Sequence, residues 1–248
     1  FRKANLNDSL SSVIFDNYLE NLDNQKLYFL KSDIDKYEQY RFSFDEFLKS
    51  GKLDIPFEIY NLYKSRFNQR MKYVFSLLKS EFDFNVDESI VIDRSKSNWA
   101  KNDEELNDIW RRRIKNDWLN LKLSGKKESD IAETLKKRYQ TMHKYILQSQ
   151  NDDVFQVYIN SFAEAIDPHT TYFSPKNSED FKIDLTLSLE GIGAQLTLEN
   201  DYTKVSKIIT GGPAEKGGQL KENDKIIAVA QGEDGELVDV VGWKLDDV

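Results

Sequence analysis

The sequence Gly191-Ile192-Gly193, followed by Ala194, has the residue types of a carboxylate-binding turn. A glycine–apolar–glycine turn lets the backbone come close to a ligand and lets successive amide N–H groups converge. Such a nest can hold a carboxylate, and the edge of a neighbouring strand can pair with an added peptide strand. The same pattern is also typical of a plain β-bulge or tight turn. We therefore treat these residues as a candidate site for the carboxylate at the end of a peptide.

The residues around this turn alternate between apolar and polar, with the period of two that predicts half-buried strands. The first run covers residues 183–189, and a second run begins directly after the turn. In the second run, Leu196 and Leu198 are equally compatible with core packing and with lining a peptide groove. Further along the chain, Trp243 and Leu245 begin a predicted helix. Both are candidates for lining that groove, and Trp243 is equally suited to capping the core.

Two Ser-x-x-Lys spacings, Ser76 to Lys79 and Ser124 to Lys127, match the pattern of a serine nucleophile with a lysine base. Ser76 lies on an amphipathic helical pattern and Ser124 lies at a predicted helix end, so a structural role is favoured for both. His169 follows Asp-Pro without a Ser-His-Asp context, and we expect a hydrogen-bonded loop residue there rather than a catalyst. No catalytic residue is predicted in this chain.

The composition excludes several classes of protein and site. The 248 residues suggest one large or two ordinary domains, and the net charge of −8 without a basic tract argues against nucleic acid or an anionic membrane as partner. No apolar run approaches the ~20 residues of a transmembrane helix. The absence of cysteine and the wide separation of His143 from His169 argue against disulfides and metal sites, and no cofactor is predicted. Phe1 is not preceded by a leader, so any signal peptide is expected to have been removed or never to have existed.

Residues 1–168 are predicted to form an all-helical domain. Pro56 occupies a favourable first-turn position, and an i+3/i+4 apolar progression follows it over about five turns. Gly51 is expected to end a preceding helix, and Asn102 with a glutamate three residues later predicts a capped helix start. Pro168 ends the last helix, because the residue before a proline is driven out of helical conformation.

The remaining residues predict a different architecture. Residues 169–182 are expected to connect the domains as a loop, and residues 183–248 are expected to form a small β-rich domain. Asn223 precedes an aspartate in a turn that requires a left-handed backbone, which asparagine tolerates best after glycine. The predicted fold class is therefore α+β, with a helical domain followed by a β-rich one.

Three motifs in the β-rich part occur in the order found in bacterial PDZ domains, and the whole chain resembles the N-terminal part of the tail-specific proteases, or C-terminal processing peptidases. The PDZ-like motifs are Gly191-Ile-Gly-Ala194, Gly211-Gly-Pro-Ala214 and Asn223-Asp-Lys-Ile-Ile227. The stretches closest to the protease family are Asp93-Arg-Ser-Lys96, Ile166-Asp-Pro-His-Thr170, Tyr172-Phe-Ser-Pro175, Ser188-Leu-Glu-Gly-Ile-Gly-Ala194 and Val240-Val-Gly-Trp-Lys-Leu-Asp-Asp-Val248.

This resemblance implies the recognition portion of a periplasmic serine endopeptidase that binds the C-termini of unfolded or tagged protein substrates and degrades or processes them. The family's nucleophilic serine and its lysine base lie in a core that follows the PDZ domain. They match no residue here, so this chain is expected to be inactive alone. The resemblance also implies that the PDZ domain over 183–248 is incomplete at its C-terminal end. The alternatives are a non-catalytic peptide-binding adaptor and a helical scaffold that binds protein partners.

Overall fold

The computed structural model describes residues 5–175, 178, 181–182, 191–199, 202–230, 232 and 235–248. The chain divides into two compact units, Phe1–Ser174 and Pro175–Val248, which we call the helical unit and the C-terminal unit. The predicted first run of alternation, residues 183–189, lies outside the described residues. The chain is mostly helical in its first part and contains a small sheet in its second, so the predicted α+β class is confirmed.

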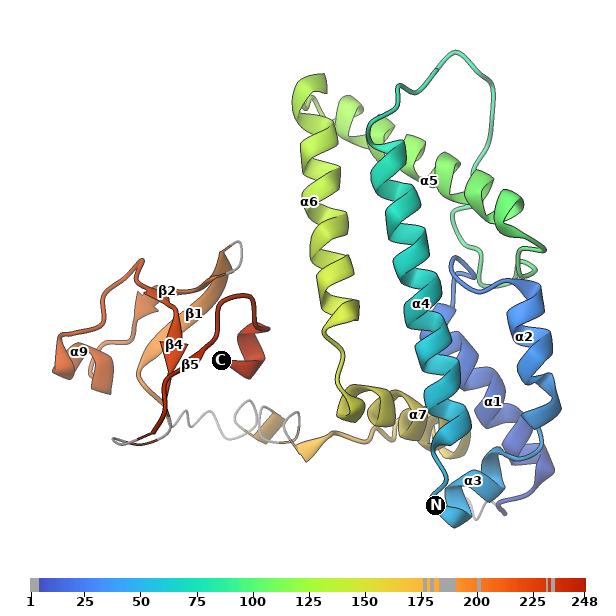
Figure 1. The fold of residues 1–248 in the computed structure, drawn as a ribbon, viewed down its shortest axis with the longest axis horizontal. Helices are drawn as coiled ribbons and strands as arrows, with labels where there is room; N and C mark the ends of the chain where they lie inside the picture. The colour runs from blue at the N-terminus through green and yellow to red at the C-terminus, as the bar shows by residue number, and fades with distance from the viewer. Residues whose placement is uncertain are drawn as a thin grey trace. The chain divides into compact units, whose positions relative to one another are not determined.

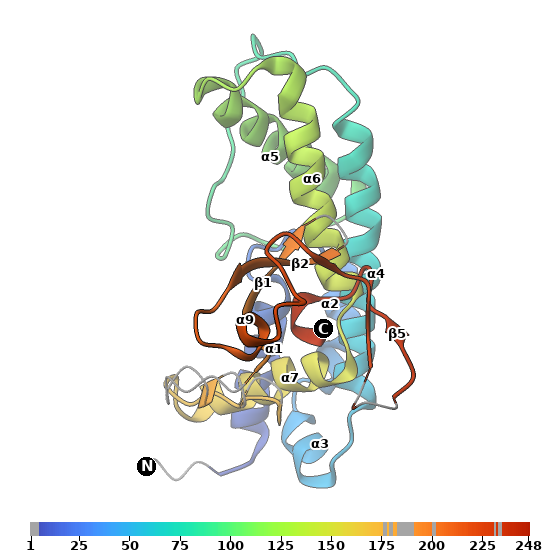
Figure 2. The ribbon, with the colours of Figure 1, turned by 90° about the vertical axis from the view of Figure 1, so that its left-hand side faces the viewer.

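The helical unit is built around the long helices α4 and α6, which lie side by side (Figures 1 and 2). α5 packs on both of these helices, and α1 packs on α3 and α7. The helices are α1 (Asp8–Asp23), α2 (Lys31–Tyr37), η1 (Glu38–Tyr40), α3 (Phe44–Ser50), α4 (Asp54–Leu77), α5 (Asp103–Leu123), α6 (Glu128–Leu147) and α7 (Asn151–Ile166).

Several helix ends lie where the sequence predicts them. Gly51 follows α3 with φ +68°, a left-handed conformation that glycine adopts without steric cost. The Asn102 side chain accepts a hydrogen bond of 2.9 Å from the Glu105 N–H and so caps the start of α5. α7 ends at Ile166, two residues before Pro168. Local residue chemistry therefore determines these boundaries.

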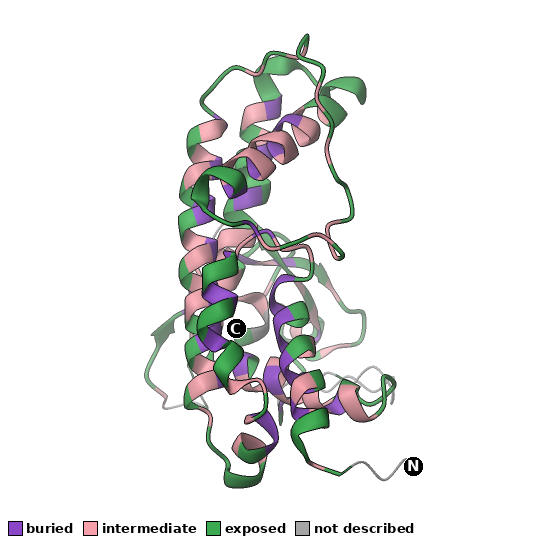
Figure 3. Cartoon of the chain, turned by 90° about the vertical axis from the view of Figure 1, so that its right-hand side faces the viewer, coloured by how far each residue is buried: buried purple, intermediate pink, exposed green. Residues whose placement is uncertain are grey.

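Aromatic side chains fill the core of the helical unit, and Figure 3 shows the buried positions along the inward faces of its helices. Trp110 is 1% exposed, and its indole N–H donates to the Leu27 carbonyl over 2.7 Å. The Tyr18 hydroxyl donates to the Pro56 carbonyl over 2.8 Å. The polar ends of these rings thus keep a hydrogen-bond partner while their apolar surface is removed from water.

The buried loop between α1 and α2 depends on a single carboxylate. Asp23 is 3% exposed and accepts hydrogen bonds from the backbone N–H groups of Leu27, Tyr28 and Phe29 at 2.8, 2.8 and 3.0 Å. Backbone donors in a buried loop lack a ladder partner, so this carboxylate supplies the acceptors that they need. Leu27 and Phe29 can therefore enter the core from irregular backbone.

The C-terminal unit contains two small antiparallel sheets and a short helix. β1 (Ala194–Glu199), β2 (Tyr202–Ile208) and β3 (Lys225–Ile226) form one sheet in that order, and β4 (Ala228–Val229) pairs with β5 (Val238–Asp239) in the other. The helix α9 (Pro213–Gly217) has proline at its first position, and η2 (Leu245–Asp247) lies beside β1 (Figure 1). Asn223 has φ +75°, which confirms the left-handed turn predicted there.

The structure corrects two expectations. The connector is not a loop throughout, because Pro175, Ser178 and the pair 181–182 are helical, and proline is favoured at a helix start. The predicted helix near the C-terminus is a short 3₁₀ turn, and Trp243 precedes it at 40% exposure. Trp243 therefore does not cap the core of the described residues.

Candidate peptide-binding site

The Gly191-Ile192-Gly193 turn is held in place by hydrogen bonds to residues far along the chain. The Ile192 carbonyl accepts from the Ala214 N–H in α9 over 2.8 Å, and the Gly193 carbonyl accepts from the Ile209 N–H over 2.9 Å. The carbonyl groups of Ile192 and Gly193 are thereby occupied. Within the described part of the chain, no backbone acceptor pairs with the N–H groups of Ile192 and Gly193. Two adjacent donors without an acceptor among the described residues are what a carboxylate-binding nest requires.

Gly193 is needed for both its conformation and its size. Its φ is +74°, and a Cβ added there would lie 2.9 Å from Gly212 Cα and 2.9 Å from Pro213 Cδ. Gly212 is equally constrained, because its added Cβ would lie 2.9 Å from the Ile209 carbonyl oxygen. The two glycines let the turn pack directly against the start of α9. By contrast, a Cβ added at Gly191 meets no atom of the described residues within 4 Å.

The free edge of β1 begins directly after this turn. Among the described strands β1 has one neighbour, β2, and it lies at the edge of the three-stranded sheet. The Gly193 carbonyl faces β2, and carbonyl directions alternate along a strand, so the backbone groups of Ala194 and Leu196 face away from β2. Val205, which is opposite Leu196, supports this geometry because its N–H and C=O bond to Asp224 and Asn223 instead. Among the described residues, the outward-facing groups of Ala194 and Leu196 have no backbone partner, as an edge that accepts an added strand requires.

Apolar side chains lie along the same strand and beside it. Leu196 is half-buried, Leu198 is 43% exposed, and Ile192 is 52% exposed next to the turn. Leu245, at the start of η2, is half-buried beside β1. The structure thus brings three of the four predicted groove residues to one region. The fourth, Trp243, lies in the turn that leads into η2, where its N–H donates to the Val240 carbonyl.

In both Ser-x-x-Lys spacings the serine hydroxyl bonds to backbone of its own helix. The Ser76 hydroxyl donates to the Tyr73 carbonyl over 2.7 Å, and the Ser124 hydroxyl donates to the Leu121 carbonyl over 2.8 Å. Each hydroxyl therefore donates to a backbone carbonyl of its own helix. His169 is exposed, and its ring lies 3.3 Å from the Asp167 carboxylate, which confirms a hydrogen-bonded loop residue. The N–H and ring of His169 lower the pKa of Asp167.

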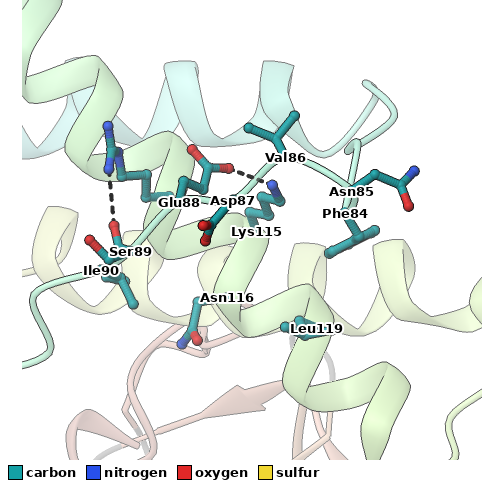
Figure 4. Close-up of a pocket in the computed structure, with 11 residues that line it drawn as sticks. Phe84, Asn85, Val86, Asp87, Glu88, Ser89, Ile90, Lys115, Asn116 and Leu119 are labelled. Carbon is teal, nitrogen blue, oxygen red and sulfur yellow. Dashed lines mark hydrogen bonds and ion pairs between the residues drawn. The ribbon is translucent and has the colours of Figure 1, made fainter.

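A cavity of about 310 Å³ lies between the loop of residues 84–90 and α5 (Figure 4). Nothing in the sequence marked it in advance. Glu88 fixes the loop, because its carboxylate accepts two hydrogen bonds from Arg111, of 3.0 and 2.6 Å, and another from Lys115. Those bonds, from Arg111 first and then Lys115, lower the pKa of Glu88 to about 2. Glu88 is thus paired with Arg111 and Lys115, and these ion pairs tie the loop to α5.

Within the ranges that the structure describes, no group of acidic or histidine side chains has the arrangement of a metal site. The described helices also include none long and apolar enough to cross a bilayer. The free backbone donors at Ile192 and Gly193, with the open edge of β1, are therefore the strongest candidate for a ligand site.

Comparison with known proteins divides the chain near the same point as the structure. Residues 1–176 match the family described as "Tail specific protease N-terminal domain", and residues 181–248 match the PDZ domain family. A tail-specific protease of Haemophilus influenzae is 43% identical over 100% of this chain and 36% of its own length. The carboxy-terminal processing protease CtpA of Bacillus subtilis is 29% identical over 44% of this chain and 25% of its own length.

Among solved structures, the PDZ domain of a carboxy-terminal protease from Vibrio cholerae, in complex with peptide, is 54% identical. It covers 24% of this chain and 59% of that chain, with a TM-score of 0.23. The present chain spans 36% of the length of its Haemophilus relative and 25% of the length of the Bacillus one.

Proposed function

The chain belongs to the tail-specific protease family, and on this premise we propose that its C-terminal unit binds the C-terminal segment of a protein substrate. The observation that carries the proposal is the geometry of the Gly191–Gly193 turn. The carbonyl groups of Ile192 and Gly193 are already bonded, while the N–H groups of the same two residues have no partner among the described residues. A ligand at this turn must bring acceptors, and a terminal carboxylate brings two of them.

In the proposed complex, the substrate's last residue lies beside Ala194 and its chain runs antiparallel to β1. Its carboxylate accepts hydrogen bonds from the N–H groups of Ile192, Gly193 and Ala194. Its backbone pairs with the outward-facing groups of Leu196 and, further along, Leu198. A charge-assisted hydrogen bond to a carboxylate contributes about 1.5–3 kcal/mol, so the free C-terminus accounts for much of the affinity.

The experiment compares two labelled peptides that differ only in their C-terminal group, titrated into the chain by fluorescence anisotropy. One peptide ends in leucine with a free carboxylate, and the other is the same peptide amidated. We expect the amidated peptide to bind roughly 10- to 100-fold more weakly, because it loses the negative charge and an acceptor. Equal affinities of the two peptides would contradict the proposal that the turn binds a carboxylate.

We further propose that the parent protein is a periplasmic serine endopeptidase whose catalytic serine and lysine lie outside these 248 residues. The protease names of the relatives support this, as do the backbone hydrogen bonds that occupy the Ser76 and Ser124 hydroxyls. Incubating the chain with an unfolded protein that has an apolar C-terminus should leave that protein intact. Cleavage that disappears in Ser76→Ala or Ser124→Ala would contradict the proposal.

The location and the alternative role have their own tests. Cell fractionation of the tagged parent protein is expected to place it in the periplasmic fraction, and recovery in the cytoplasm would contradict this. If the full-length parent protein binds free C-termini but cleaves none of the substrates that carry them, it is a peptide-binding adaptor and not an endopeptidase.

A further inference from the structure

We propose that the outer face of the β1–β2–β3 sheet reads the penultimate residue of the bound tail, and that Lys207 makes it prefer an acidic side chain there. The inference rests on the proposed function, because it needs the tail to lie along β1. It adds a specificity that neither the turn nor the apolar residues beside it supply.

The register of the sheet assigns each tail side chain to a face. Residues directly opposite each other in paired strands project on the same face. If the last residue lies opposite Ala194, the penultimate residue lies opposite Gln195, and Gln195 is paired with Lys207 on β2. The inner face of the sheet holds the buried residues Thr203 and Val205, and Gln195 and Lys207 lie on the other, outer face.

The outer face is rich in lysine although the chain as a whole has a net charge of −8. Lys204 lies opposite Lys225, and like charges in that arrangement repel each other. Both have a local partner, since Lys204 pairs with Glu199 over 3.1 Å and Lys225 lies 4.7 Å from the centre of the Tyr202 ring. In the described part of the chain, Lys207 has neither an ion pair nor a hydrogen bond from its side chain. Among the described lysines of this face, Lys207 is therefore the exposed cation whose side chain can still form an ion pair.

A surface hollow of about 480 Å³ lies at the same row of the sheet, lined by Ala194, Gln195, Lys207, Ile209 and Thr210. It adjoins the start of β1, where the proposed tail ends. A strand added to β1 would lie two strand spacings from β2, about 10 Å. A glutamate on that strand and Lys207 can extend toward each other across this gap. The hollow and the unpaired cation together define a place for an acidic penultimate side chain.

The test uses labelled peptides ending in Glu-Leu or Gln-Leu, each as the free acid and as the amide, titrated into the whole chain. We expect the free acid ending in Glu-Leu to bind about 2- to 5-fold more tightly than its Gln-Leu counterpart, the range for an exposed ion pair. The ratio is expected to fall to about one in Lys207→Gln, to survive in Lys207→Arg, and to shrink in high salt. Lys225→Gln removes the same charge from the next row of the same face and is expected to keep the preference.

Each outcome separates this inference from the proposed function. Equal binding of the two free acids, with weaker binding of both amides, would overturn the penultimate preference and leave the carboxylate site standing. Equal binding of acids and amides, or no binding of any peptide, would overturn both. Loss of the preference in Lys225→Gln to the same extent as in Lys207→Gln would also overturn the inference, because general surface charge would then explain it.

Discussion

The helical unit and the C-terminal unit use their apolar residues in different ways. The helical unit fully buries large rings such as Trp110, Tyr18 and Phe44. In the described part of the C-terminal unit, the buried apolar side chains are Val205 and Val240, while Ile192, Leu198 and others stay more than a third exposed. The first unit is therefore held by side-chain packing. The described residues of the second rely more on backbone hydrogen bonds and glycine conformations, and they leave apolar surface beside the N–H groups of Ile192 and Gly193.

The largest effect that tests this comparison is expected from Trp110→Ala. Truncating a fully buried tryptophan costs about 3–5 kcal/mol of unfolding free energy, and here it also leaves the Leu27 carbonyl without its 2.7 Å partner. Denaturant unfolding followed by circular dichroism measures the loss. Leu123→Ala is the control on the same helix, since Leu123 is 76% exposed, and its expected change is within about 0.5 kcal/mol. Equal losses in the two variants would contradict a packed core around Trp110.

The second-largest effect is expected from Gly193→Val. This substitution tests the backbone conformation of the C-terminal unit rather than the side-chain packing of a core. Gly193→Val puts a branched side chain at φ +74° and against Gly212 and Pro213, at a strain of about 1–3 kcal/mol. Binding of the free-acid peptide is expected to weaken roughly 10- to 100-fold. The matched control is Gly217→Ala, outside the turn, where an added Cβ meets no described atom within 4 Å, and its affinity should stay within about 2-fold of the original. Unaltered binding by Gly193→Val would show that the turn does not hold the ligand.

The smallest effect concerns the loop tied to α5 by Glu88. Because Arg111 and Lys115 lower the pKa of Glu88 to about 2 from its ordinary value near 4.5, its carboxylate stabilises the fold above pH 4.5. This contribution should decline as the pH falls through about 2. Glu88→Gln is expected to cost about 1 kcal/mol at neutral pH and nothing at the acid end, measured by denaturant unfolding across that range.

The control for this titration is Glu20→Gln on α1, because Glu20 is exposed and has no ion pair in the described part of the chain. It should leave the unfolding free energy at neutral pH unchanged. A pH-independent difference between Glu88→Gln and the original chain would argue that the ion pairs do not fix the loop.

The sequence predicted the features that local chemistry determines, and it missed those that depend on distant contacts. Gly51, Asn102 and Asn223 have the conformations expected from their types and neighbours. The turn at Gly193 was also predictable as a turn. Its fit against Gly212 was not, because that close approach depends on where α9 packs.

Two other features of the C-terminal unit could not be predicted from the sequence. β2 has one more residue than β1 between the pairs Gln195–Lys207 and Leu196–Val205, and this bulge sets the register on which the outer face depends. Ile226 and Val229 are three positions apart in one apolar run, but they belong to β3 and β4 in different sheets. The bulge and the division between sheets both depend on which strands pair with each other, and a single sequence does not specify those pairs.

The most direct test of the central claim follows the backbone amides of the chain in ¹⁵N-labelled protein. On addition of the free-acid peptide, we expect the amide signals of Ile192, Gly193 and Ala194 to shift most, because their N–H groups would donate to the carboxylate. The amide of Leu196 should follow as the tail pairs with β1, and signals from the helical unit should stay in place. Shifts confined to other residues, or the same shifts with the amidated peptide, would contradict recognition of a free C-terminus at this turn.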